Sequence, residues 1–318
     1  MLALTPFEQG QLFTADEILQ NLKKIFDETK RLIILLDTTL DPKIFDQIKA
    51  DVGDKHIIYI PLAKGQKTDN TAVFFIEIKE QVVLDKVSAE LVGKISQHFN
   101  QDNNEYYVCG FGSSKLDNEK LNKIFKKTLV LKDDSSEFIF RWYDPRVLIY
   151  LDDIFTEYEL NSLLGLFDHW QFIHPIGYLE WKKNNLEKFI KKNIYKLSTQ
   201  QSLALDFIEI SNLVFKEAIN YPEIDLYFTQ PKNILKNIYY AYEQYDIENY
   251  TDLFSYGLYC EILGSQFFIH PDVQSILTQF WKVEPNKYSF TEAMAFLEKK
   301  DWMAIQQDLK ILESKMHG

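Results

Sequence analysis

One segment of the chain has the composition of a catalytic or phosphate-binding turn. Gly110-Phe-Gly-Ser-Ser114 follows an apolar, strand-like run, which is where a nucleophile elbow or a phosphate loop begins. It lacks the glycine that follows the serine of an elbow, and it lacks the lysine and second glycine of a phosphate loop. We therefore interpret Gly110–Ser114 as a turn between a strand and a helix.

The side chains that ligate metals are spaced too widely to share a helix face. No histidine lies three or four residues from another, since the six stand at positions 56, 98, 169, 174, 270 and 317. The two cysteines, Cys109 and Cys260, are too few for a disulfide framework or a four-cysteine zinc site. The pair Asp152 and Asp153 is expected on a helix surface. We expect no metal and no cofactor.

Asp37 is the acidic residue best placed for chemistry. It ends an apolar run, and α/β sheets bind ligands at the carboxyl ends of their strands. It also precedes Thr38 and Thr39, and the favoured interpretation is that its carboxylate caps this turn. Two acids distant in sequence can meet in space, but 47 acidic residues give no basis for choosing a pair.

The string Phe140-Arg-Trp-Tyr-Asp-Pro-Arg146 predicts a rigid corner. Asp144 precedes a proline, so it is biased away from helical geometry, and it can cap a helix whose first position is Pro145. Arg141 and Arg146 flank the aspartate and can form charge-assisted pairs with it. We interpret these four residues as a structural motif at the junction of two domains, without a catalytic role.

The elements that position these residues alternate between strand and helix in the first half of the chain. Short apolar runs, typical of strands buried on both faces, occupy 31–37, 56–61, 72–78, 106–110 and 138–143. Helical patterns occupy 15–29, 42–49, 87–99 and the residues after the cap Asp117. This order predicts an α/β domain over 1–144, with a mixed or mostly parallel sheet and flanking helices.

Beyond residue 144 the pattern is mainly helical. A hairpin is predicted over 170–181, because a Pro and a Gly lie between two apolar stretches. Caps and prolines then mark helix starts at Ser198, Pro231, Asn249, Pro271, Ser289 and Asp301. We predict an all-α domain over 145–318, apart from this hairpin.

Composition excludes several classes of protein. With 46% hydrophobic and 26% charged residues and only 11 Gly and 9 Pro, the 318-residue chain is globular rather than disordered. The net charge of −12 repels phosphate backbones and anionic lipids, so no nucleic-acid partner is expected. No apolar run approaches a membrane span, and the first residues lack the basic start of a signal peptide. We expect a cytoplasmic protein without membrane insertion.

A tyrosine-rich segment has the composition of a protein-binding surface. Residues 239–259 hold seven of the 18 tyrosines, interleaved with acids, and tyrosine is enriched in interface cores. The same tyrosines also continue the apolar helix face that includes Ile238, so interface and core packing both remain open. The candidates for partner binding are Tyr239, Tyr242, Tyr245 and Tyr250.

The segment 182–196 is basic within an acidic half of the chain. Its lysines, among them Lys188, Lys191 and Lys192, alternate with apolar residues at helical spacing. This pattern predicts a basic amphipathic helix. It is a candidate for binding an acidic patch of a partner, but a solvated helix face is the favoured alternative.

Two strings and one tryptophan carry a resemblance to a known family. They are Leu35-Leu-Asp-Thr-Thr39, Phe140-Arg-Trp-Tyr-Asp-Pro-Arg-Val-Leu148, and Trp170 after the helix that follows. Over about residues 31–170 the chain resembles the type VI secretion effector-chaperone family, the Tap/TEC adaptors. The likeness is weaker in the helical half.

The resemblance implies an adaptor and not an enzyme. Such adaptors bind a toxic effector in the cytoplasm of a Gram-negative bacterium and help load it onto the spike protein of the secretion apparatus. The implied partners are a cognate effector and a spike protein, and we expect the chain alone to be a monomer. The alternatives are an α/β hydrolase or nucleotide-binding enzyme that uses Gly110–Ser114 and Asp37, and a scaffold that oligomerises through its tyrosine-rich face.

Overall fold

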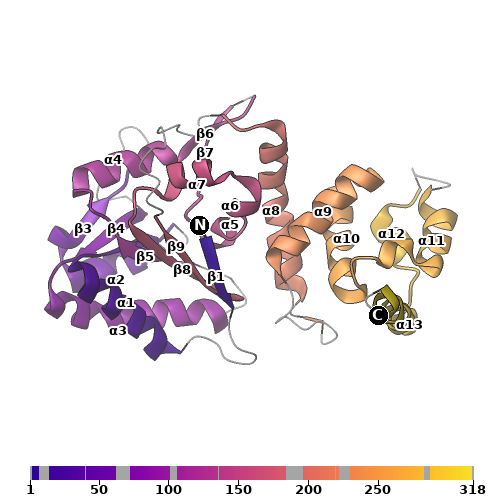
Figure 1. The fold of residues 1–318 in the computed structure, drawn as a ribbon, viewed down its shortest axis with the longest axis horizontal. Coiled ribbons are helices and arrows are strands. Elements are labelled where there is room, and N and C mark those ends of the chain that lie inside the picture. Colours follow the sequence, from indigo (N-terminus) through magenta and orange to yellow (C-terminus); the bar gives the residue numbers. More distant parts are fainter. Residues whose placement is uncertain are drawn as a thin grey trace. The chain divides into compact units, whose positions relative to one another are not determined.

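The chain forms two compact units, Met1–Thr199 and Gln200–Gly318. The computed structural model describes residues 2–6, 14–39, 41–61, 72–100, 106–134, 136–183, 196–218, 220–221, 230–282 and 287–316. The first unit is a sheet with helices, and the second is helical (Figure 1).

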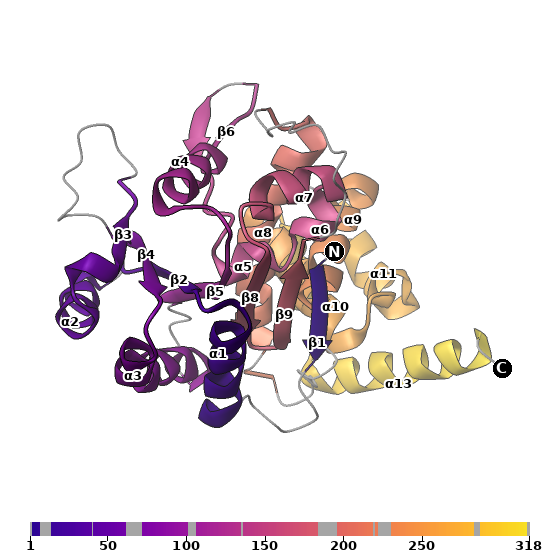
Figure 2. The same cartoon turned by 60° about the vertical axis from the view of Figure 1, so that its left-hand side comes forward.

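A seven-stranded sheet forms the centre of the first unit. Its strand order is β1-β9-β8-β5-β2-β4-β3, and Figure 2 shows these strands side by side from β3 to β1. The strands are β1 (Leu2–Pro6), β2 (Leu32–Asp37), β3 (Ile57–Tyr59), β4 (Val73–Ile78), β5 (Val108–Ser113), β8 (His169–His174) and β9 (Gly177–Lys182). Each neighbouring pair is antiparallel.

The sheet was predicted to be mixed or mostly parallel, and this prediction was wrong, because each described pair of neighbouring strands is antiparallel. The apolar runs of β2, β4 and β5 are buried along their whole length, as predicted. Burial on both faces is typical of parallel sheets but requires only that both faces be covered. The residues of an apolar strand do not determine whether the neighbouring strand runs parallel or antiparallel to it. The segments that connect the strands decided their relative direction.

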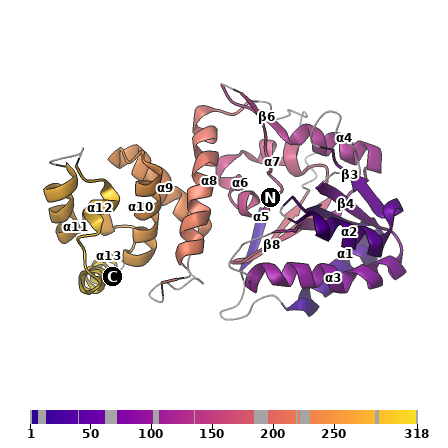
Figure 3. The same cartoon turned by 180° about the vertical axis from the view of Figure 1, so that it is seen from behind.

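Helices cover both faces of the sheet. On one side lie α1 (Ala15–Thr29), α2 (Pro42–Val52) and α3 (Gln81–Asn100), and on the other lie α4 (Asn118–Thr128) and α7 (Glu157–Leu164). Figures 1 and 3 show α1 and α3 on one side and α4 opposite. Alternate residues of β2, such as Ile34, pack in the core with α1, α2 and α3. On the far face Phe75 meets Phe125 of α4 edge-on, with ring centroids 5.0 Å apart.

The chain between α4 and α7 is more broken than the sequence predicts. The predicted strand over 138–143 ends at Ile139: β7 (Glu137–Ile139) pairs only with β6 (Val130–Lys132), in a separate two-stranded sheet. The next four residues bend instead, and the short helices α5 (Pro145–Leu148) and α6 (Leu151–Ile154) follow. Alternation of side chains therefore does not extend through Tyr143.

The predicted hairpin is present as β8 and β9, but it belongs to the sheet of the first unit. β8 pairs with β5, and β9 pairs with β1. Because these pairings join the hairpin to the sheet, the boundary between compact units falls at 199/200, not at the predicted 144/145. The Arg141–Arg146 corner consequently lies inside the first unit and not at a junction.

The second unit is helical, as predicted. Its elements are α8 (Thr199–Ala218), α9 (Pro231–Tyr245), α10 (Tyr250–Leu263), α11 (Pro271–Ile276), the π-helix Leu277–Lys282, α12 (Phe290–Met294) and α13 (Lys299–Met316). Asn249 and Ser289 cap α10 and α12, as expected, whereas α13 begins two residues before Asp301. Within the described ranges no helix combines the length and apolarity that crossing a bilayer requires.

Replacing Gly112 tests how closely β5 approaches β8, and replacing Gly93 in α3 is the control. A Cβ at Gly112 would overlap the carbonyl oxygen of His169, whereas a Cβ at Gly93 in α3 would enter open space. We expect Gly112→Ala to lower the free energy of unfolding by about 1–3 kcal/mol, because the strands must move apart. Gly93→Ala should raise it by about 0.5–1 kcal/mol. Urea unfolding measures both, and equal effects would contradict the close approach of the strands.

Candidate functional site

Asp37 and the Arg141–Arg146 corner meet in a buried ion-pair network. Arg141 Nη2 lies 2.7 Å from Asp37 Oδ2 and 3.7 Å from Asp144 Oδ2. Arg146 Nη2 lies 2.6 Å from Asp144 Oδ2. Arg141 therefore lies between two carboxylates that are 107 positions apart in the sequence, and Arg146 pairs with the second of them.

The end of β2 presents Asp37 to this network. Its Oδ1 accepts hydrogen bonds from the backbone N–H and the hydroxyl of Thr39, at 3.0 and 2.5 Å. Its Oδ2 accepts a hydrogen bond of 2.9 Å from the hydroxyl of Tyr143. The carboxylate thus caps the turn after β2, as the favoured interpretation had it, and also binds a residue of the corner.

Asp144 binds backbone and side chain at once. It caps α5 by accepting from the N–H of Arg146 at 3.0 Å, and Pro145 occupies the first helical position. Arg146 Nε also donates a hydrogen bond of 3.0 Å to Asp144 Oδ1, and Arg146 Nη2 donates one to Oδ2. The guanidinium therefore binds both carboxylate oxygens. The cap and the arginine pairing that the sequence indicates are both present here.

Burial and charge together determine the protonation of this network. The side chains of Asp37 and Asp144 are 2% and 7% exposed, and the guanidiniums are partly exposed. Burial by itself lowers the pKa of Arg141 and Arg146, but nearby negative charge, chiefly that of Asp37 and Asp144 respectively, outweighs it and raises both values. Both arginines therefore remain charged.

The other ionisable groups beside the network are held in their neutral forms. Burial raises the pKa of the Tyr143 hydroxyl and of the Cys109 thiol, and the charge of Asp37 raises both further. Burial lowers the pKa of His174 to about 3, although the charge of Asp144 opposes this shift. A neutral buried thiol is a poor nucleophile. The arrangement is suited to holding β2 and the corner together and not to transferring protons.

Gly110–Ser114 is not a turn between a strand and a helix. Gly110–Ser113 belongs to β5, in the middle of the sheet. A Cβ at Gly110 would collide with the indole ring of Trp170, so glycine is required here by packing. The hydroxyl of Ser114 donates to the Leu166 carbonyl oxygen at 2.6 Å. Within the described ranges no group of three or more His, Cys, Asp or Glu residues could hold a metal ion.

The candidate tyrosines of the second unit divide into different environments. Tyr239 and Tyr242 pack on Phe207 of α8, at centroid distances of 6.1 and 5.4 Å. Tyr245 stacks on Phe268 at 3.8 Å, while Tyr250 is 44% exposed. Three of the four candidate tyrosines thus pack against other aromatic rings, and Tyr250 lies at the surface.

Beside Tyr245 lies a groove of about 740 Å³ that we call the aromatic groove. It is lined by Gln244, Tyr245, Asp246, Phe268, Ile269, Gln274, Trp281 and Lys282. Only Tyr245 was singled out from the sequence. The other aromatic walls come from separate elements, and no spacing in the sequence relates them.

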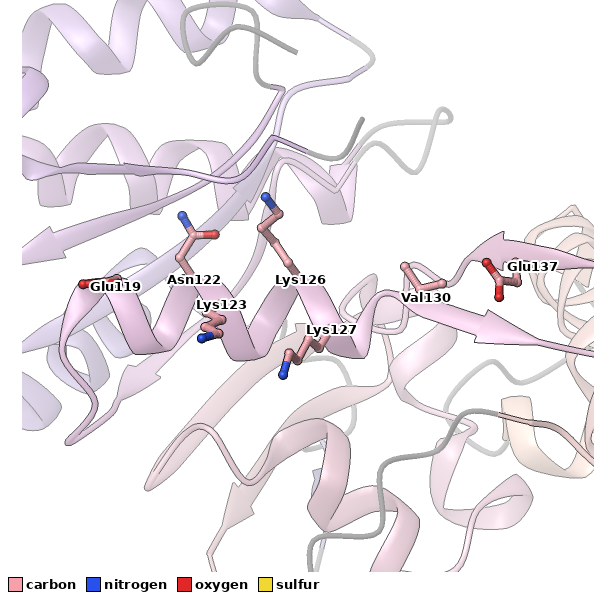
Figure 4. Close-up of a pocket in the computed structure, with 7 residues that line it drawn as sticks. All are labelled: Glu119, Asn122, Lys123, Lys126, Lys127, Val130 and Glu137. Carbon is pink, nitrogen blue, oxygen red and sulfur yellow. The ribbon is translucent and has the colours of Figure 1, made fainter. Parts of the chain in front are cut away.

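A second groove, of about 750 Å³, lies on α4 and the β6–β7 hairpin in the first unit. Figure 4 shows Lys126 projecting from one side of α4 and Lys123 and Lys127 from the other, with Val130 past the end of the helix. From the sequence, α4 was predicted as a helix that follows the cap Asp117, and its lysines were not predicted to form a site. Lys188, Lys191 and Lys192 lie outside the described residues. Lys182 is in β9 and Lys196 forms an isolated bridge with Lys132, so neither end of the predicted 182–196 helix is helical.

Searches of protein-family models, of curated proteins and of solved structures found nothing that matches this chain. Functional inference therefore depends on the residues and on their geometry.

Asp144→Ala tests whether the corner depends on charge as well as on capping. The variant removes the cap of α5 and the buried carboxylate that pairs with Arg146 and lies 3.7 Å from Arg141, so we expect a loss of about 2–4 kcal/mol in the free energy of unfolding. Asp144→Asn keeps a capping oxygen and should lose less. Asp117→Ala, which removes an exposed cap of α4, is the matched control and should have the smallest effect. Equal losses for Asp144→Ala and Asp117→Ala in urea unfolding would contradict the network.

His174 should make the folded state sensitive to acid. Between pH 6.5 and 3 the unfolded chain binds a proton at His174 that the folded chain does not, so stability falls as the pH falls. From pH 7.5 to pH 5.0 this residue alone should remove about 2 kcal/mol. Urea unfolding of the wild type and of His174→Gln at both pH values measures the difference. Equal losses in the two proteins would show that His174 is not the source.

Proposed function

We propose that this protein is a cytoplasmic adaptor that binds a secreted effector and helps load it onto the spike protein of a type VI secretion apparatus. The proposal rests on the resemblance carried by 35–39 and 140–148. One observation supports it most: Asp37 of the first string and Arg141 of the second are partners in one buried ion-pair network. Because residues of the two strings bind each other, the presence of both strings supports the resemblance more strongly than the presence of either one.

The state of the ionisable residues favours binding over turnover. The two carboxylates of the network are occupied by arginine, tyrosine, threonine and backbone donors. A general acid or base needs a proton that it can exchange with a substrate. The enzyme alternative draws no support from Gly110–Ser114, because that segment is explained by the packing of β5.

Exposed apolar side chains of the second unit supply adhesive surface for such a role. Tyr240 is 52% exposed and Ile269 is 63% exposed. Tyrosine presents a large contact area at a low entropic cost, which suits a protein interface. The cognate effector and the spike protein are the partners that we propose.

Co-expression with the effector and spike protein encoded beside its gene tests this function. We expect the tagged protein to co-purify with that effector, and its deletion to abolish secretion of that effector alone. A second effector of the same cell, encoded elsewhere, is the control and should be secreted normally. Failure to co-purify, together with normal secretion after deletion, would refute the proposal.

A further inference from the structure

We propose that the aromatic groove of the second unit binds a basic side chain, arginine or lysine, of a partner polypeptide. The groove would bind such a side chain whichever protein supplies it.

Three aromatic rings line the groove, and the ring of one of them, Phe268, already faces a cation of the chain itself. Tyr245 and Phe268 stack with ring planes 18° apart, and Trp281 meets Phe268 edge-on at 6.3 Å. The faces of tyrosine, tryptophan and phenylalanine carry partial negative charge and attract ammonium and guanidinium groups. Trp281 and Lys282 end a π-helix, a rare geometry that is frequent at functional sites.

A cation of the chain itself already occupies one of these faces. The Nζ of Lys282 lies 5.8 Å from the centroid of the Phe268 ring. It is oriented by a hydrogen bond of 3.0 Å to Oε1 of Gln274. The groove therefore accepts an ammonium group in its present form. Lys282 is exposed, so it can move away when a stronger cation enters.

The surrounding charge selects for a basic partner. Residues 200–318 contain nine basic and 17 acidic residues, which is a net charge of −8. Asp246 lines the groove and is exposed. A field of this sign raises the local concentration of basic segments and repels acidic ones.

Apolar surface beside the groove indicates which residues should flank the basic side chain of the partner. Ile269 lines the groove, and the ring centroid of the exposed Tyr240 lies 5.5 Å from that of Tyr245. Burial of these side chains needs apolar neighbours in the partner. We therefore expect a segment in which the basic residue is flanked by apolar residues.

Fluorescence anisotropy with a labelled ten-residue peptide, in which arginine alternates with leucine, tests the proposal on the full chain. A peptide with glutamate in place of arginine is the control ligand and should not bind. Lys282→Ala should strengthen binding of the arginine peptide about threefold or more, because it vacates the ring face. Lys216→Ala removes the same charge from α8 and should change binding less than twofold. The contrast between these variants separates the groove from net charge.

Two further variants test the rim and the wall. Asp246→Asn should weaken binding about threefold, whereas Glu209→Gln, which removes an exposed carboxylate of α8, should change it less than twofold. Tyr245→Leu keeps an apolar wall, loses the ring and should weaken binding about fivefold or more. Thermal unfolding of each variant verifies that the unit remains folded. Equal effects of Lys282→Ala and Lys216→Ala, or tighter binding of the glutamate peptide, would overturn the proposal.

Discussion

The first unit depends on the requirement that buried charges be paired. Asp37 and Asp144 are almost fully removed from water, and an unpaired carboxylate in such a position would cost several kcal/mol. Arg141 and Arg146 meet this requirement while keeping part of each guanidinium in solvent. The pairing ties the end of β2 to the turn before α5. The place of the corner on the sheet therefore follows from electrostatics as much as from apolar packing.

The glycines of β5 express a second constraint of the same unit. Trp170 of β8 is fully buried and stacks on Phe167, at 3.8 Å. Its indole ring occupies the space where a side chain at Gly110 would lie. A segment that has the composition of a catalytic turn is thus used to admit a large aromatic ring. Residues that invite a chemical interpretation serve packing and pairing in this protein.

The surfaces of the two units have contrasting chemistry. The aromatic groove belongs to an acidic helical unit, whereas the groove on α4 carries three lysines. An aromatic groove in an acidic unit suits basic segments, and a groove with three lysines suits acidic ones. Two surfaces of opposite preference are what a protein with two different partners would need, and this supports the adaptor role that we propose.

Local signals in the sequence determined the helices, the caps and the apolar strands. Some features depend only on residues that are neighbours in the sequence, so they can be predicted without the tertiary structure. They include the cap at Asp117, the capping box at Ser289 and the turn between β8 and β9. Strand direction, the contact between Asp37 and Arg141, and the meeting of Tyr245, Phe268 and Trp281 were decided only by tertiary structure. Each of these relates residues that are distant along the chain, and no period or spacing encodes such a distance. The strand over 138–143 was misjudged for the same reason, because Arg141 and Tyr143 both bind the distant Asp37 and the strand ends at Ile139.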